Sequence, residues 1–190
     1  VALNCVANGR VLRESNFDNV WIQPAAGDAG GALGVAMFVW YQLLENERTQ
    51  HEEEMPASDR QQASLLGPEF SDDEICGVLK RQNAVYQTAE SDEDLCRQVA
   101  RFMADGRVVG WFQGRMEFGP RALGNRSILG SPNHSGVADR INAQIKYRER
   151  WRPFCPSMLD KVAPEILQTD HPSPYMTFTF NVAESWKSRI

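Results

Sequence analysis

The residues best suited to chemistry lie between positions 114 and 127, where the sequence reads Gly-Arg-Met-Glu-Phe-Gly-Pro-Arg-Ala-Leu-Gly-Asn-Arg-Ser. Arg115, Arg121 and Arg126 carry planar forks of N–H donors that match the oxygens of phosphate and carboxylate groups. The glycines between them allow positive φ and let the backbone approach a ligand closely. We therefore predict an anion-binding loop. The alternative is a solvated hairpin loop whose arginines pair with surface carboxylates.

Two further observations limit the chemistry of this loop. Glu117 is placed to hold one of the guanidinium groups. The spacing from Gly119 to Gly124 and Ser127 is superficially that of a P-loop, but Asn125 stands where that motif requires a phosphate-binding lysine. The segment is therefore not a P-loop.

A second basic cluster occupies positions 146 to 153, in the order Lys-Tyr-Arg-Glu-Arg-Trp-Arg-Pro. Arg152 precedes the proline, which favours extended backbone and aims this side chain away from the preceding helix. Ser157 follows a few residues later. One alternative is a basic helix C-terminus stabilised by the helix dipole. Another is nucleic-acid binding, because Tyr147 and Trp151 are interleaved with the basic residues.

The turn Gly27-Asp-Ala-Gly-Gly31 precedes a predicted helix. Backbone N–H groups at a helix N-terminus favour anions, yet Asp28 is itself an anion. This carboxylate therefore acts either as the helix N-cap or as a ligand to a metal ion that bridges to phosphate. The spacing alone favours the cap.

The composition, 42% hydrophobic and 24% charged, is that of an ordinary soluble globular protein. The four cysteines lie far apart with no CxxC or Cys/His spacing, so we predict no disulfide framework or zinc site, and a reducing cytoplasmic location. The histidines show no helical pairing, and we predict none as a catalytic residue or metal ligand. No apolar run reaches the roughly 18 residues of a membrane span. The cysteines are Cys5, Cys76, Cys96 and Cys155, and the histidines are His51, His134 and His171.

Charge is unevenly distributed along the chain. Residues 45–94 contain fourteen Asp and Glu against four Lys and Arg, which is typical of a solvated face. Residues 107–152 contain nine Lys and Arg against three acidic residues. The net charge of −5 argues against a general nucleic-acid binder.

Helices and strands alternate in the predicted fold. Ser71-Asp-Asp-Glu has the spacing of a capping box, and Ser91-Asp-Glu-Asp repeats the signature, so each begins a predicted helix. These helices end near Gln82 and at Asp105-Gly106. Further helices are predicted at 1–14, about 29–45 and 135–148, strands at 20–23, 108–113, 127–129 and 175–182, a turn at 24–31 and extended backbone at 154–159. Mixed elements with long connections predict an α/β or α+β fold.

The ends and the middle of the chain suggest its organisation. The polar, irregular stretch 50–63 predicts a linker between two domains. The chain begins with Val1 instead of Met, and it ends at Ile190 without a closing pattern. We therefore expect an excised fragment.

Four motif-bearing segments read VALNCVANG at 1–9, IQPAAGDAGGALG at 22–34, GWFQGRMEFGPRALGNRSI at 110–128 and RPFCPS at 152–157. Together they resemble the nodulation and antibiotic-tailoring O-carbamoyltransferases of the NodU/CmcH type. The segments occur in the family's order and span nearly the whole chain, and the third is too long for a chance match.

The resemblance implies two catalytic domains. Residues 1–49 would be the C-terminal part of an actin-like ATPase-fold domain that transfers the carbamoyl group, akin to the tRNA threonylcarbamoyl-transferring enzymes. Residues 50–64 would be the linker, and residues 65–190 a YrdC-like α/β domain, truncated at its C-terminus.

The resemblance also implies an activity. Members consume carbamoyl phosphate and ATP, form carbamoyl-adenylate in the YrdC-like domain, and transfer the carbamoyl group to a hydroxyl of a sugar or specialised metabolite, such as a nodulation factor or an antibiotic. Two phosphate-bearing substrates repel by about 4 kcal/mol per unit-charge pair at about 4 Å and an effective dielectric near 20, so a site for both needs several fixed cations. The acceptor is not readable from these motifs.

By family match, each candidate residue acquires an expected role. Arg121, Lys146 and Arg152 would hold carbamoyl phosphate or the ATP phosphates as the catalytic cations. Four further residues would bind substrate or phosphate in support, namely Arg115, Arg126, Ser127 and Ser157. The nucleotide pocket of the first domain would be lined by Asn4, Gly30 and Gly31.

Metal binding is implied as well. Mg²⁺ would accompany ATP. Asp28 would be a metal ligand, whereas the spacing alone favours a role as the helix N-cap. The metal there could be iron or another transition metal. The family's paired metal-binding histidines lie upstream of Val1, so we expect the N-terminal part of the protein to be missing and this fragment by itself to be inactive.

Two other functions stay open. A YrdC-like module for RNA binding or tRNA modification would explain the basic, aromatic-containing segment, although the net charge disfavours a nucleic-acid partner. A regulatory ATP-binding domain without carbamoyl chemistry is the other.

Overall fold

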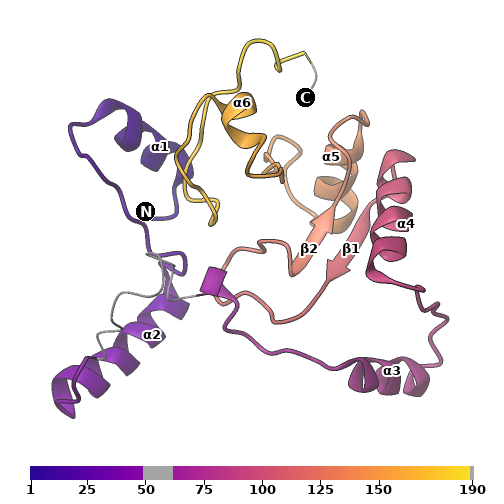
Figure 1. Ribbon diagram of the computed structural model, residues 1–190, viewed down its shortest axis with the longest axis horizontal. Coiled ribbons are helices and arrows are strands. Elements are labelled where there is room, and N and C mark those ends of the chain that lie inside the picture. Colours follow the sequence, from indigo (N-terminus) through magenta and orange to yellow (C-terminus); the bar gives the residue numbers. More distant parts are fainter. Residues whose placement is uncertain (49–61, 189–190) are drawn as a thin grey trace. The chain divides into compact units, whose positions relative to one another are not determined.

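Residues 1–48 and 62–188 are described by a computed structural model (Figure 1). Their contacts divide the chain into two units, each built from three segments. The first unit comprises Val1–Pro68, Arg115–Leu123 and His171–Phe180, and the second comprises Glu69–Gly114, Gly124–Asp170 and Asn181–Ile190. Of the predicted linker at 50–64, residues 50–61 lie outside the described residues, and the predicted domain boundaries stay a prediction.

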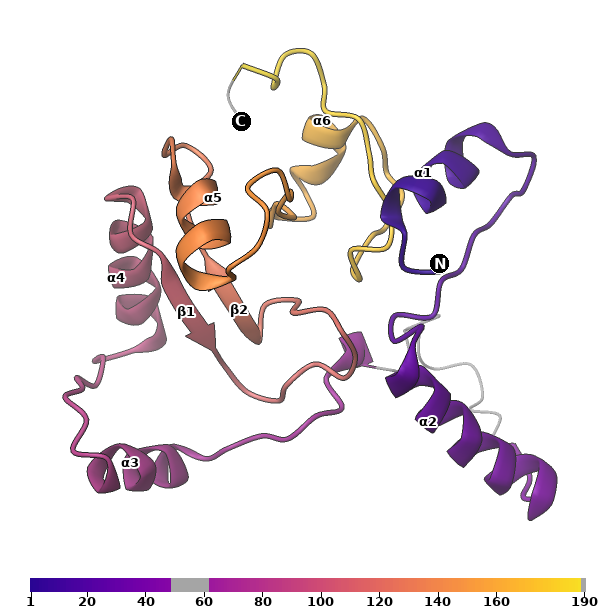
Figure 2. The same cartoon turned by 180° about the vertical axis from the view of Figure 1, so that it is seen from behind.

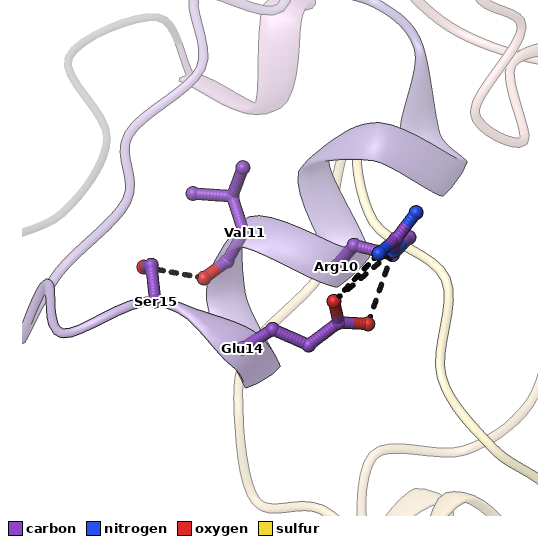
Figure 3. Close-up of polar contacts among 4 residues, drawn as sticks. All are labelled: Arg10, Val11, Glu14 and Ser15. Atoms are coloured by element: carbon purple, nitrogen blue, oxygen red, sulfur yellow. Dashed lines mark hydrogen bonds and ion pairs between the residues drawn. The ribbon is translucent and has the colours of Figure 1, made fainter.

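The first unit begins with helix α1, Cys5–Glu14, which confirms the predicted helix from its fifth residue onward. The helix starts there because the Asn4 side chain accepts a hydrogen bond from the Ala7 N–H at 3.1 Å. Arg10 donates through Nε and Nη2 to the Glu14 carboxylate, an i,i+4 pair on the exposed face (Figure 3). This pair lowers the pKa of the Glu14 carboxyl, chiefly through the hydrogen bond from Arg10.

The strand predicted at 175–182 is wrong, because this segment forms no ladder in the structure. Its carbonyl groups instead accept hydrogen bonds from side chains of α1. Asn8 Nδ2 donates to the Thr177 oxygen at 3.0 Å, and Arg13 Nη1 donates to the Thr179 oxygen at 2.6 Å. The segment runs beside α1 in both views (Figures 1 and 2). A helix therefore supplies the donors that a neighbouring strand would supply in a sheet.

Helix α2, Asp28–Phe38, continues as a π-helical turn at Val39–Leu43, which confirms the long helix predicted at 29–45. The strand predicted at 20–23 is wrong. The Gln23 side chain accepts from the Ala25 N–H and its backbone oxygen from the Ala26 N–H, so its groups close a turn. Gly27 is the N-cap residue, so Asp28 is the first helical residue and not the cap that its spacing favours.

In the second unit, both predicted capping signatures begin helices, α3 at Asp72–Arg81 and α4 at Asp92–Ala104. The sheet has two antiparallel strands, β1 at Val109–Phe112 and β2 at Arg126–Leu129, with Val109 opposite Leu129. Helix α4 lies beside β1 in both views (Figures 1 and 2). These four elements confirm the corresponding predictions.

The rest of the second unit is helical or irregular. The helix predicted at 135–148 is shorter, with α5 at Val137–Arg140 followed by a π-helical turn at Ile141–Ile145. Helix α6 covers Ala163–Leu167. A Cβ at Gly130 would lie 2.6 Å from Cγ1 of buried Val137, so a glycine after β2 lets α5 pack closely.

The described residues thus combine helices with a small sheet, which confirms the mixed α/β class. The YrdC-like and actin-like assignments stay predictions. All four cysteines are free thiols. In the described parts of the chain, no helix has both the length and the apolar character needed to cross a membrane.

Candidate anion-binding site

The arginine loop, residues 115–123, is closed by a buried carboxylate. Glu117 is only 3% exposed, and its Oε1 accepts a hydrogen bond from the Leu123 N–H at 2.5 Å. Gly119, between these two residues, has a φ of +113°, a conformation that favours glycine. The loop therefore has a defined conformation that presents Pro120 and Arg121 at its tip. Whether Glu117 also orients a guanidinium, as predicted, stays a prediction.

The N-terminal end of the arginine loop is anchored to residues 64–68. Met116 exchanges backbone hydrogen bonds with the chain at 67–68, and the Phe118 N–H donates to the Ser64 oxygen. Arg115 donates through Nη1 to the Gly67 oxygen at 3.0 Å. Its guanidinium thus contributes to anchoring the loop as well as carrying charge.

The loop also contacts the turn that begins α2. A Cβ added at Gly119 would lie 3.1 Å from Cβ of Ala25, which is 1% exposed. The Ala25 oxygen in turn accepts a hydrogen bond from the Gly30 N–H at 2.9 Å. The arginine loop and the start of α2 therefore pack on the same buried residue, although nearly a hundred residues separate them in sequence.

Arg121 is held against the N-terminal segment. Its Nη2 donates to the Leu3 oxygen at 3.2 Å, and the side chain is partly buried. Leu3 precedes Asn4, one of the predicted nucleotide-binding residues. The first unit therefore brings Arg121 together with the segment that carries Asn4.

The three predicted nucleotide-binding residues differ in whether the local structure already requires them. Asn4 already uses its side-chain oxygen as the N-cap of α1. A Cβ at Gly30 would lie 2.3 Å from the Ala25 oxygen, so the turn itself requires this glycine. A Cβ at Gly31 would meet no described atom within 4 Å, so this glycine faces open space. Close approach of a ligand would explain Gly31, whereas local packing explains Gly30.

Asp28 lies exposed in the first turn of α2, where the helix dipole favours a carboxylate. Within residues 1–48 and 62–188, no three His, Cys, Asp or Glu side chains gather closely enough to hold a metal ion. The described residues therefore do not form a metal site by themselves.

In the second unit, Arg126 and Ser127 are the first two residues of β2, and both are partly buried. Ser127 Oγ accepts a hydrogen bond from the Gly124 N–H at 3.0 Å. This bond fixes the backbone where the loop enters the strand.

The basic segment, residues 146–152, also belongs to the second unit. Lys146 is exposed, as is Ser157 further along the chain. Arg152 Nε pairs with the Glu149 carboxylate at 2.9 Å. The backbone N–H of Glu149 and the charge of Arg152 lower the pKa of that carboxyl, so it stays ionised beside the guanidinium.

The sequence matches two family models. Residues 1–37 match the carbamoyltransferase N-terminus, and residues 100–190 match the carbamoyltransferase C-terminus. The chain belongs to the carbamoyltransferase family.

Several curated proteins are similar to this chain over nearly its whole length. The chain is 54% identical over 97% of its residues to uncharacterized protein sll1178 of Synechocystis sp.. It is 40% identical over 100% to nodulation protein NolNO of Sinorhizobium fredii, and 39% identical over 97% to nodulation protein NolO of Bradyrhizobium diazoefficiens. The chain spans 29%, 27% and 33% of the lengths of these three relatives.

The candidate residues of this chain fall within the matched ranges. Asn4, Asp28, Gly30 and Gly31 lie in the N-terminal match, and the arginine loop and the basic segment lie in the C-terminal match. The first unit thus contains residues of both matched ranges. Within it, Gly119 and Arg121 of the C-terminal match contact Ala25 and Leu3 of the N-terminal match.

Sequence reasoning missed Asn142. It is fully buried in the π-helical turn, beside Ile141, and bonds to the basic segment. The sequence offers no signal that separates Asn142 from Gln144, which also lies between the apolar Ile141 and Ile145 but is exposed. Only burial distinguishes the two amides, because a buried amide needs polar partners.

Proposed function

We propose that this chain is part of an enzyme that transfers a carbamoyl group from carbamoyl phosphate to a hydroxyl of a sugar or specialised metabolite, with ATP as second substrate. The observation that carries the proposal is the packing of the arginine loop on the start of α2, since both segments lie in carbamoyltransferase matches. The names of the relatives NolNO and NolO support a nodulation factor as one acceptor class.

In the proposed reaction, water cleaves carbamoyl phosphate to carbamate and inorganic phosphate, and the carbamate oxygen displaces pyrophosphate from ATP to form carbamoyl-adenylate. Transfer of the carbamoyl group to the hydroxyl then releases AMP, and the hydroxyl proton is lost. Both starting substrates are anions whose repulsion must be offset by fixed cations. Arg121, Lys146 and Arg152 would bind their phosphate groups. Supporting contacts would come from Arg115, Arg126, Ser127 and Ser157.

Arg121 is suited to this role by its surroundings. The closed loop limits its backbone, and the bond from Nη2 to Leu3 engages one edge of the guanidinium. A planar guanidinium that is oriented in advance can donate two hydrogen bonds to one phosphate without first losing conformational freedom. The loop therefore supplies orientation as well as charge.

Nucleotide and metal binding by the first domain are also part of the proposal. Gly31, which faces open space, and Asn4 would line the nucleotide pocket, with Gly30 maintaining the turn. Asp28 would supply one carboxylate to a divalent metal, which could be Mg²⁺ with ATP or iron. In the full-length protein, metal content of an Asp28→Asn variant tests the assignment, and parental content would leave Asp28 as a residue that only stabilises α2.

We also propose the finer architecture that the family implies, a YrdC-like domain preceded by the end of an actin-like ATPase-fold domain, in a cytoplasmic enzyme. The mixed elements of the second unit and its free cysteines support this assignment.

The decisive experiment is isotope exchange between pyrophosphate and ATP in the full-length protein. We expect exchange that requires carbamoyl phosphate, because reversible adenylate formation returns labelled pyrophosphate to ATP. Exchange that is independent of carbamoyl phosphate would instead indicate an ATP-binding domain without carbamoyl chemistry. Mass spectrometry of products with candidate acceptors would then identify the hydroxyl.

One observation favours a second candidate, an RNA-binding module. Tyr147 and Trp151 are 85% and 77% exposed, so their rings are available for stacking beside the basic side chains. RNA binding that weakens steeply with salt would support this function. The carbamoyl proposal predicts no such binding by the full-length protein at physiological salt.

A further inference from the structure

The basic segment folds back on one buried amide. Asn142 is 0% exposed and lies in the π-helical turn that precedes the segment. A buried amide is stable only if its donors and acceptor are hydrogen-bonded, so its partners indicate what it holds in place.

All partners of the Asn142 amide belong to the basic segment. Nδ2 donates to the Arg150 oxygen at 3.2 Å and to the Arg152 oxygen at 2.9 Å. Oδ1 accepts from Arg148 Nε at 2.6 Å. The backbone oxygen of Asn142 also accepts from the Arg148 N–H at 2.9 Å. One residue therefore holds every second residue of the segment, at positions 148, 150 and 152.

The backbone of the segment needs this support. Tyr147 has a φ of +47°, which is uncommon for an aromatic residue and persists only where the surroundings enforce it. On one side of it, the Lys146 N–H donates to the Ile141 oxygen at 2.9 Å, and on the other side Arg148 is held twice by Asn142. Asn142 thus stabilises the reversal of the chain at Tyr147, which lies between Lys146 and Arg152.

The arrangement divides the cations into two groups. Arg148 bonds to Asn142, and its guanidinium lies 5.0 Å from the centre of the Phe154 ring, so it is part of the scaffold. Lys146, Arg150 and Arg152 remain exposed. Ile141 fixes the main chain of Lys146, and Asn142 fixes that of Arg150 and Arg152. Such main-chain anchoring defines where their charged groups can reach.

We propose that Asn142 is a positioning residue that holds the backbone of Lys146–Arg152 in the conformation that binds carbamoyl phosphate. This inference rests on the proposed function of Lys146 and Arg152. Asn142 does not itself contact substrate and acts through the backbone of Arg152. Its contribution should therefore depend on the presence of the Arg152 side chain.

The test uses the full-length protein and titration with carbamoyl phosphate. Asn142→Asp keeps an oxygen for Arg148 but loses the Nδ2 donor to the two carbonyl groups. We expect affinity to weaken at least tenfold, the scale for losing a residue that orients a binding group. The thermal midpoint should also fall, because at this buried site an oxygen then faces the two carbonyl groups. Gln144→Ala is the matched control, because it removes an exposed amide two residues away on the same helical turn. We expect it to bind as the parent does.

A double-mutant cycle separates positioning from general damage. In an Arg152→Ala background, Asn142→Asp should have a much smaller effect on affinity, because the side chain that it positions is gone. Parental affinity of the Asp variant, or equal effects in both backgrounds, would overturn the inference. If the Asn142 variants do not fold, Arg148→Ala loosens the same reversal from the opposite side, and parental affinity of that variant would overturn the inference as well.

Failure of the proposed function gives a different pattern. If Lys146→Ala and Arg152→Ala both bind carbamoyl phosphate like the parent, the basic segment is not the binding site, whatever Asn142 does. If these two variants bind weakly and the Asn142 variants bind normally, the site is correct and the positioning role is wrong.

Discussion

Arg121 combines the features expected of a phosphate-binding residue, because it follows Gly119-Pro120 in a closed loop and one of its nitrogens is already engaged by Leu3. In the full-length protein, Arg121→Lys keeps the charge but loses the forked geometry. We expect carbamoyl-adenylate formation, measured by pyrophosphate exchange, to fall on the order of 10²–10³-fold. Arg101→Lys, on the exposed face of α4, should exchange like the parent. Parental exchange by the Arg121 variant would make this arginine structural.

Gly119 is the residue at which the loop is most sensitive to an added methyl group. Its φ of +113° is strained for any other residue, and a Cβ would lie 3.1 Å from Ala25. We expect Gly119→Ala to destabilise the chain by about 1–2 kcal/mol in urea unfolding, the scale for a left-handed non-glycine residue. Gly110→Ala, where a Cβ meets open space and φ is ordinary, should leave stability unchanged or slightly higher. Equal urea midpoints of unfolding for both variants would show that the loop accommodates the added methyl group without strain.

At the scale of elements, the capping box of α3 is the clearest local interaction. The Ser71 N–H and hydroxyl both donate to Glu74 Oε2 at 2.8 Å, and the Ser71 hydroxyl accepts from the Glu74 N–H. The backbone N–H of Ser71, followed by its hydroxyl, lowers the pKa of the Glu74 carboxyl. The first turn of α3 therefore depends on an ionised carboxylate.

This arrangement predicts a pH dependence. Because the folded pKa lies below the ordinary value of about 4.3, the stabilisation is complete above that pH and is lost as the pH falls through the lower folded value. We expect hydrogen-exchange protection of the α3 amides to fall below about pH 4, and Glu74→Gln to show a weaker pH dependence. Ser71→Ala should lower protection about fivefold at neutral pH. A pH profile identical in parent and Gln variant would contradict the role of the charge.

At the scale of the whole molecule, α2 and its π-helical continuation expose an unusual amount of apolar surface. None of residues 28–43, all of which the structure describes, is buried. The large exposed apolar side chains on this helix are Val35, Met37, Phe38, Val39, Trp40 and Leu43. Contiguous apolar surface of this kind binds hydrophobic probes and promotes association.

We therefore expect the 190-residue chain to bind a hydrophobic dye strongly, and a Trp40→Gln, Leu43→Gln variant to bind about half as much or less. Val6→Gln, which removes a single exposed apolar side chain from α1, is the matched control and should bind dye like the parent. Dye fluorescence measures probe binding, and light scattering measures association of the chain. Unchanged dye binding in the double variant would show that the apolar surface lies elsewhere.

The sequence by itself determined the local features of this chain. The helices after Ser71 and Ser91 begin where their capping signatures predict, because a cap involves groups within three residues of each other. The strands at 108–113 and 127–129 follow from short apolar runs on either side of a glycine-rich loop. The family was recognisable from its motifs, since these record residue types and order and do not require their positions in space.

Only the tertiary structure decided which distant groups meet. Arg121 and Leu3, joined by a hydrogen bond, are 118 positions apart, and Asn8 and Thr177 are 169 apart. The segment at 175–182 has the alternation of a strand, yet its carbonyl groups are satisfied by side chains of α1. Asn142 likewise became interpretable only when its burial and partners were known. Local pattern specifies which backbone shapes are favourable, whereas the partner that satisfies each polar group depends on how the chain folds back on itself.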